Sequence, residues 1–201
     1  MKVALVRGVH LNPFELQLYA PLARQIPLAL IGAHWQFYST PFDTFGMELR
    51  RGHAQFERWS RFGSNWPFWL NRIASRTTGQ SFSITDLPSL VSDCTILHSA
   101  ENYHSMTYQC LEIKRKHGQK LVVTVSENIP GRGENHPRRI ARKRAVNQEA
   151  DLFLAVSDRS HQMLLQEGVD NRRIVKIPMS INLQTFSEGS RDPVWMKRLG
   201  L

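Results

Sequence analysis

Polar side chains capable of acid–base or binding chemistry follow four short apolar runs of this sequence. His10 and Asn12 follow the first run, after Gly8, which offers only its backbone. The residues after the other three runs are His98, Ser99 and Glu101, then Ser126, Glu127 and Asn128, and finally Ser157. Histidine and carboxylate groups are the usual general acids and bases of enzymes. If the runs are neighbouring parallel strands, their carboxyl ends meet at one edge of a sheet, where such sheets bind ligands.

Each candidate has a structural explanation beside a functional one. Glu127 directly follows a buried-type run, where a carboxylate is costly unless it is paired or used. Glu101 fits a ligand contact or the charge compensation of a helix N-terminus. His98 could contact a ligand or be hydrogen-bonded within the fold. Gly8 could present backbone N–H groups to a phosphate or only form a tight turn.

Strand-like and helix-like segments alternate along most of the chain. Residues 2–6 and 28–31 flank a helical stretch over 14–24, in which Pro21 allows a kink or a break. From residue 92 on, strands are expected at 94–97, 121–125, 152–156 and 174–177, with helices at 102–117, 137–148 and 158–167. This alternation predicts a doubly wound, mostly parallel α/β sheet of the Rossmann-like class.

One further helix is expected between residues 35 and 90, with Asn65 as its N-cap. Its shared face consists of Trp66, Trp69, Leu70, Ile73 and Ala74. Aromatic residues at helical spacing usually belong to the core, and we expect this face to be buried. The alternative is an arginine-edged contact with a membrane interface.

Positive charge is concentrated in two segments. The chain has 26 Lys and Arg against 17 Asp and Glu, and residues 48–76 and 132–144 hold the entire excess of +9. The second segment contains the predicted basic patch, which consists of Arg138, Arg139, Arg142 and Lys143. Such a surface suits a polyanionic partner, whether acceptor phosphates, an anionic membrane face or a nucleic acid.

Several classes of protein are disfavoured by missing patterns. The sequence has no Gly-x-Gly-x-x-Gly fingerprint and no P-loop, which argues against a dinucleotide cofactor or a P-loop nucleotidase. Two cysteines cannot form a disulfide framework or a four-ligand zinc site. No apolar run is long enough for a spanning helix or a secretory signal, so we expect a cytoplasmic protein.

A set of motifs in a characteristic order adds a resemblance to a known family. The set comprises Asp93-x4-His98, Glu101-Asn-Tyr103, Thr-Val-x-Glu-Asn-Ile at 124–129, Ala155-Val156-Ser157, and the stretch from Gln166-Glu-Gly168-Val169 through Ile177-Pro178 to Phe186. In this order it resembles the N-terminal half of a GT-B glycosyltransferase of family 4. Residues 178–182, Pro-Met-Ser-Ile-Asn, depart from the family by lacking its Gly and Asp.

The resemblance implies an architecture and a reaction. Residues 1–186 would be the Rossmann-like acceptor-side domain, and 187–201 a linker toward an absent C-terminal donor domain that carries the nucleotide-sugar pocket. The complete enzyme would be a retaining transferase that moves a sugar from a nucleotide-sugar to a lipid-linked or polysaccharide acceptor, peripherally at the inner face of the cell membrane. We expect this chain alone to be inactive.

The resemblance also implies roles for residues. His98 and Glu127 would be catalytic. Gly8, His10, Asn12, Glu101 and Asn128 would contact the acceptor or the donor. The nucleotide-sugar would be a substrate rather than a cofactor, and this half would need no metal.

Two other classes of function stay open. A basic nucleic-acid-binding protein without catalysis is the main alternative, although no nucleic-acid motif is recognisable. A stand-alone carbohydrate- or partner-binding module is the other.

Overall fold

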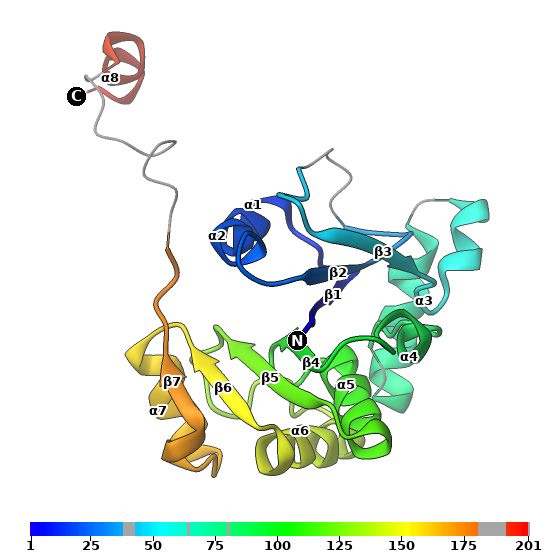
Figure 1. Cartoon of the computed structure of the whole chain (residues 1–201). Helices are drawn as coiled ribbons and strands as arrows, with labels where there is room; N and C mark the ends of the chain where they lie inside the picture. The colour runs from blue at the N-terminus through cyan, green and yellow to red at the C-terminus, as the bar shows by residue number, and fades with distance from the viewer. Residues whose placement is uncertain (38–42, 64, 80, 181–191, 201) are drawn as a thin grey trace.

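A seven-stranded parallel sheet forms the centre of the computed structural model, which describes residues 1–37, 43–63, 65–79, 81–180 and 192–200 (Figure 1). The strands pair in the order β3 (Glu48–Gly52), β2 (Leu28–Ala33), β1 (Val3–Gly8), β4 (Ile96–Ala100), β5 (Lys120–Val125), β6 (Leu152–Ala155) and β7 (Ile174–Lys176). The chain order reverses between β1 and β4, and open α/β sheets bind ligands at such a switch point. The predicted Rossmann-like class is confirmed.

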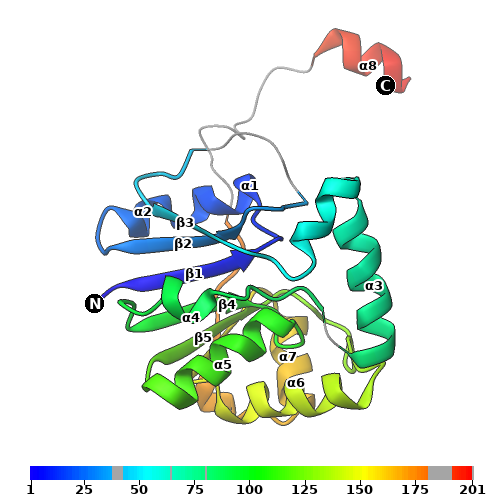
Figure 2. The same cartoon turned by 90° about the vertical axis from the view of Figure 1, so that its right-hand side faces the viewer.

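Helices cover both faces of the sheet. One face carries α4 (Leu87–Leu90), α5 (Ser105–His117), α6 (Pro137–Glu149) and α7 (Asp158–Gln166). The other face is covered over β1 and β2 by α1 (Pro13–Leu16), the 3₁₀ turn η1 (Gln17–Tyr19) and α2 (Ala20–Ala23). The 3₁₀ helix η2 (Glu57–Phe62) and α3 (Trp66–Thr78) stand at the edge toward which β1 points (Figure 2). The remaining described elements are η3 (Asn171–Arg173) and α8 (Pro193–Leu199).

Alternate side chains of β1 enter two separate hydrophobic clusters. Ala4 and Val6 pack on the side of α5, whereas Val3 and Leu5 pack on the side of Leu11 and other residues of the first loop and helices. Every residue of β1 and β2 is buried. Parallel strands buried on both faces read as continuous apolar runs, which is why the sequence revealed them.

Several boundaries differ from the predicted ones. The stretch 14–24 breaks into three short helices, with Pro21 in the first turn of α2. The strand expected at 94–97 runs from Ile96 to Ala100, and the helix after it begins at Ser105. Neither β3 nor η2 was predicted. β3 is an edge strand that reads Glu-Leu-Arg-Arg-Gly, and its charged residues give no apolar run.

The expected core face of α3 is wrong. The helix forms over Trp66–Thr78, but Trp66, Trp69 and Ile73 are 48%, 53% and 59% exposed. Asn65 occupies the N-cap position without a capping hydrogen bond from its side chain. Helical spacing places these residues on one face, but only tertiary packing decides whether that face is covered.

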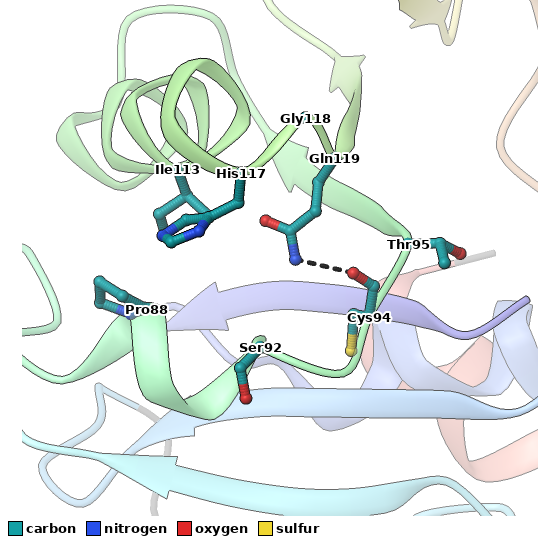
Figure 3. A pocket seen from close by; sticks show the side chains of 8 residues that line it. All are labelled: Pro88, Ser92, Cys94, Thr95, Ile113, His117, Gly118 and Gln119. Atoms are coloured by element: carbon teal, nitrogen blue, oxygen red, sulfur yellow. Dashed lines mark hydrogen bonds between the residues drawn. The ribbon is translucent and has the colours of Figure 1, made fainter.

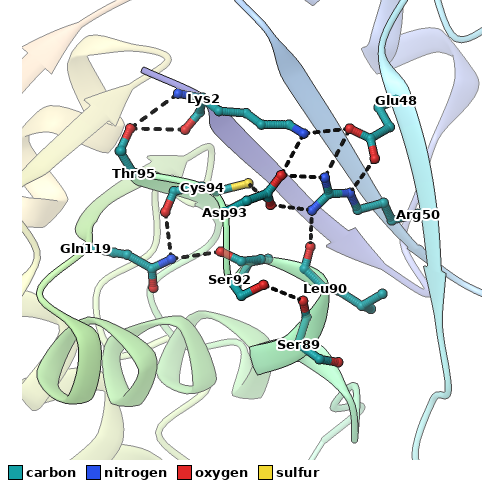
Figure 4. A network of polar contacts seen from close by, with 11 residues as sticks. Lys2, Glu48, Arg50, Ser89, Leu90, Ser92, Asp93, Cys94, Thr95 and Gln119 are labelled. Atoms are coloured by element: carbon teal, nitrogen blue, oxygen red, sulfur yellow. Dashed lines mark hydrogen bonds and ion pairs between the residues drawn. The ribbon is translucent and has the colours of Figure 1, made fainter.

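An ion-pair network joins β3 to the chain before β4, at the amino-terminal edge of the strands (Figure 4). The Arg50 guanidinium donates to both carboxylate oxygens of Asp93, at 2.6 and 2.8 Å, and also to Glu48. Lys2 Nζ lies 2.6 Å from Glu48 and 2.8 Å from Asp93. Hydrogen bonds from Arg50 and Lys2 lower the pKa of Glu48 to about 2 and hold that of Asp93 well below its usual range. The motif residue Asp93 thus ties the sheet edge to its centre.

No helix of the described residues is long and apolar enough to cross a membrane. The predicted end of the domain at residue 186, and the first part of the predicted linker, lie outside the described residues.

Candidate functional site

Glu101 joins the carboxyl ends of β4 and β5. Its Oε1 accepts hydrogen bonds from the backbone N–H of Ser126, at 3.0 Å, and from the Ser126 hydroxyl. Its Oε2 lies 3.4 Å from the backbone nitrogen of Glu127. Burial raises the pKa of Glu101, while these donors act in the opposite direction. The residue also adopts a left-handed φ of 60°, an unfavourable conformation for a glutamate that marks a tightly constrained turn.

Glu127 is half-buried and organises the loop that follows β5. Its Oε1 accepts from the backbone N–H groups of Asn128 and Ile129, at 3.0 and 3.1 Å. Its Oε2 lies 3.4 Å from Nε of Arg132. The carboxylate of Glu127 is therefore paired, as expected for a carboxylate that directly follows a buried strand. Asn128 is exposed and lines a hollow of about 320 Å³ together with residues of α7.

His10, which follows β1, contacts His104, which follows β4. Their rings stack at 5.1 Å between centroids, and the ring of His10 also lies 5.1 Å from that of Phe37. Burial lowers the pKa of His10, and burial together with the neighbouring His10 and Arg139 lowers that of His104 to about 3. Both rings are therefore neutral near pH 7.

Gly8 and Asn12 have structural explanations in the same region. Gly8 adopts a left-handed φ of 55°, and a Cβ at this position would lie 2.2 Å from Sδ of Met106. Asn12 caps α1, because its Oδ1 accepts from the backbone N–H of Phe14 at 3.0 Å. Their contacts with donor or acceptor stay predictions.

The strand-end position predicted for His98 is wrong, because β4 continues to Ala100. His98 lies inside the strand, opposite Leu5 of β1 and Val122 of β5. Its buried ring packs edge-on against Tyr19, with Nε2 2.7 Å from Oγ1 of Thr124. Burial, with a smaller contribution from Arg7, lowers the pKa of His98 far below its ordinary value.

Arg7 anchors a buried polar layer beneath the strand ends. It is 3% exposed, and its Nε lies 2.8 Å from Oε1 of Glu15. Its guanidinium also donates to the Tyr19 hydroxyl, at 2.6 Å, and to the backbone oxygen of His98, at 3.2 Å. Sequence reasoning missed Arg7. The signal was one charged residue between apolar residues that are all buried in β1.

The predicted basic patch divides into residues with different surroundings. Arg138 donates to the backbone oxygen of Thr78 at 3.3 Å, and Arg139 to that of Gly79 at 3.4 Å and to Oγ of Ser75 at 2.7 Å. These arginines therefore hold the C-terminal end of α3, where helix carbonyls lack partners. Arg142 lies over the ring of Tyr108, at 5.0 Å from its centroid.

Lys143 does not belong to the exposed patch. It is 2% exposed, and its ammonium pairs with Glu134, at 3.2 Å, and with Glu167. The carboxylate of Glu167 also accepts from the side-chain amides of Asn102 and Asn147. Helical periodicity turns this one lysine of a basic segment toward the core, where two carboxylates compensate its charge.

A hollow of about 640 Å³ opens beside these strand ends. The loop over residues 129–135 lines it together with Tyr103 and Arg139. Among the described residues, every hydrogen-bond partner of the Arg139 guanidinium is neutral, and no carboxylate forms an ion pair with it. Burial lowers the pKa of Arg139, which means that this half-buried cation lacks a full counter-charge. Arg132 adds a second guanidinium to the same hollow.

Another hollow, of about 330 Å³, lies at the opposite edge of the sheet, where β4 and β5 begin (Figure 3). Gln119 bridges it with hydrogen bonds to the backbone oxygens of Val91 and Cys94, at 2.8 and 2.7 Å. Its only titratable side chains are Cys94 and His117. It is separate from the strand-end residues, and no group of three or more potential metal ligands occurs among the described residues.

Fold and site together define a Rossmann-like α/β domain whose polar side chains gather at the carboxyl ends of β1, β4 and β5. The family model of Glycosyltransferase Family 4 matches residues 43–185, and the chain belongs to this family. A search of curated protein sequences returns no significant match.

Solved structures share the fold at low sequence identity. HepE of Anabaena in complex with UDP superposes with a TM-score of 0.60 at 11% identity, covering 99% of this chain and 50% of HepE. A putative UDP-N-acetylglucosamine 2-epimerase of Listeria monocytogenes gives a TM-score of 0.56 at 11% identity, covering 99% of this chain and 51% of the other. The chain thus spans about half the length of these proteins.

Proposed function

We propose that this chain is the acceptor-binding half of a retaining glycosyltransferase. The donor would be a nucleotide-sugar bound mainly by a second domain, and the acceptor a lipid-linked sugar or a polysaccharide at the inner membrane face. Membership of Glycosyltransferase Family 4 supports the transferase class. HepE, which shares the fold across half its length, has been solved with UDP-glucose, and this supports a nucleotide-sugar as the donor.

The observation that carries the acceptor class is the unpaired charge of Arg139 in the strand-end hollow. A guanidinium recognises phosphate through paired N–H donors, and Arg139 and Arg132 both line the space. Nearby carboxylates pair with other cations, Glu127 with Arg132, and Glu134 and Glu167 with the single ammonium of Lys143, so that none of them pairs with Arg139. The hollow is therefore suited to an acceptor that carries phosphate, such as a sugar linked to a lipid by a diphosphate.

Roles for the strand-end carboxylates follow from their positions. Glu127 would orient the acceptor hydroxyl, since among the described residues its Oε2 has only a long contact, with the exposed Arg132. Glu101 would position the loop through its bonds to Ser126 and Glu127. His98, enclosed between Tyr19 and Thr124, would act through these neighbours rather than on the substrate. This half would need no metal and no cofactor.

The test is a transfer assay on the complete transferase with several nucleotide-sugars and with acceptors that carry or lack a diphosphate. We expect Arg139→Gln to lower kcat/KM for the diphosphate acceptor by about 10- to 100-fold, the worth of a charged hydrogen bond. Arg144→Gln, an exposed neighbour on α6, is the matched control and should have little effect. Equal losses in both variants, or no transfer from any donor, would contradict the proposal.

A further inference from the structure

The outward side of α3 is apolar. Trp66, Trp69 and Ile73 follow one another at the three- and four-residue spacing of a single helix face, and each is about half exposed. Phe62, at the end of the preceding η2, is 57% exposed. We call these four residues with the arginines of the same segment the η2–α3 face. Contiguous exposed apolar surface of this kind marks an interaction site.

The side of α3 that faces the protein is mixed, with polar residues beside the apolar Pro67, Leu70 and Ala74. Polar Ser75 faces the protein, where its Oγ accepts from Arg139 at 2.7 Å, and Asn71 is half-buried. Pro67 is the only residue of α3 that is buried. The tryptophans therefore point to the outside although polar residues of the same helix are available for that role.

The charge of the η2–α3 face is positive throughout. Its four arginines, all exposed, are Arg58, Arg61, Arg72 and Arg76. The segment's one acidic residue, Glu57, accepts from the backbone N–H of Ala54 at 2.8 Å. Arg61 and Arg72 lie over the rings of Phe62 and Trp69, at 4.7 and 5.7 Å. None of the four arginines forms an ion pair with another described residue.

We propose that the η2–α3 face binds the surface of an anionic lipid bilayer. Tryptophan rings partition to the level of the lipid headgroups, and arginines beside them meet headgroup phosphates. A face with four cations and no free carboxylate is complementary to that surface, whereas a protein partner would need a matching acidic patch with apolar sockets.

The position of the face fits the acceptor hollow. The C-terminal end of α3 is held by Arg138 and Arg139, and Arg139 also lines the hollow at the strand ends. Figure 2 shows α3 along the edge of the domain toward which β1 points. Bilayer contact would therefore bring a lipid-linked acceptor beside the site. In this respect the inference rests on the proposed function, whereas lipid binding by the face does not.

The test is co-sedimentation of this chain with vesicles of neutral phosphatidylcholine, and with vesicles containing about one third anionic phosphatidylglycerol. We expect binding to the anionic vesicles that weakens with added salt, because salt screens exposed charges beyond about 10 Å at 0.1 M. Arg72→Gln with Arg76→Gln should weaken binding by about 25-fold, at about fivefold for each charge near the surface. Trp66→Ala with Trp69→Ala should weaken it by about 10-fold or more.

Two matched controls lie outside the face. Trp195→Ala, on α8, removes a tryptophan that is 57% exposed and has Arg198 over its ring, and Arg144→Gln removes an exposed charge. Both should bind vesicles like the unaltered chain. Absence of binding to anionic vesicles, equal losses in the controls, or self-association that depends on Trp66 and Trp69 would overturn the proposal.

Activity of the complete transferase separates this inference from the proposed function. If the face binds lipid, the Trp66→Ala, Trp69→Ala variant keeps transfer to a water-soluble acceptor and loses transfer to one embedded in vesicles. Vesicle binding without transfer from any donor would contradict the function and leave the lipid face standing. Transfer without vesicle binding would support the proposed function and contradict lipid binding by the face.

Discussion

At the residue scale, charge and exposure prove to be separate properties. Lys143 stands among five arginines in the 132–144 segment, yet it is almost completely buried. Its ammonium, the carboxylates of Glu134 and Glu167 and two asparagine amides form one network that joins the loops after β4 and β5 to α6 and the end of α7. Lys143 thus holds these segments together and is not part of the exposed basic surface.

We expect Lys143→Met to lower the free energy of unfolding by about 3–5 kcal/mol, because the carboxylate of Glu167 would stay buried without its cation. Urea titration followed by circular dichroism measures the change. The double variant Lys143→Met, Glu167→Leu should recover much of the loss. Arg115→Met, which breaks the largely exposed pair with Glu149, should cost only about 0–1 kcal/mol. A similar small cost at Lys143 would show that the network is not buried in solution.

At the element scale, the turn after β1 depends on how closely α5 approaches it. The side chain of Met106 lies against the backbone of Gly8, so that no Cβ fits between them. The glycine also has a positive φ, which other residues adopt at a cost. A lone glycine before a helix therefore has a sufficient reason in packing, beside any role toward a phosphate.

Gly8→Ala should destabilise the protein more than Gly118→Ala, by about 1–3 kcal/mol. Gly118 has a φ of 77°, but open space surrounds its Cβ position, so this control measures the backbone strain alone. Comparison of the two midpoints in urea tests the difference. Shortening the obstructing side chain, in Gly8→Ala with Met106→Ala, should reduce the excess. Equal costs for the two single variants would exclude the steric explanation.

At the scale of the whole molecule, three segments contribute one buried and two half-buried histidines that folding keeps neutral. His10 comes from the loop after β1, His98 from β4, and His104 from the start of α5. Burial lowers the pKa of each ring, in the case of His104 to about 3. Below the unfolded value of 6.5, the unfolded chain binds protons that the folded protein does not.

Proton uptake by these histidines in the unfolded chain therefore lowers the free energy of unfolding as the pH falls below about 6.5. Well above that pH they have no such effect. For His104, whose pKa is lowered to about 3, the free energy of unfolding should fall by about 1.4 kcal/mol between about pH 7.5 and about pH 5.5. Urea unfolding at both pH values should show the loss, and His104→Gln should make the pH dependence shallower by that amount. An unchanged dependence in the variant would show that the His104 ring takes up its proton in the folded protein.

Local signals in the sequence determined most of the elements and the fold class. Buried parallel strands read as apolar runs, and caps such as His136 and Gly118 mark helix ends within a few residues, so both are visible without a structure. The same signals correctly placed Glu101 and Glu127 after neighbouring strands. The resemblance to Glycosyltransferase Family 4 depended on motifs between residues 93 and 186, and the family match confirms it.

Tertiary structure alone decided which side chains are enclosed and which are free. His98 is inside β4 because pairing with β1 and β5 extends that strand, and Lys143 is buried because Glu134 and Glu167 arrive from other segments. The tryptophans of α3 are exposed because no described element covers that face. Spacing along the chain tells which residues share a face. Burial depends on contacts between distant segments, which spacing does not contain.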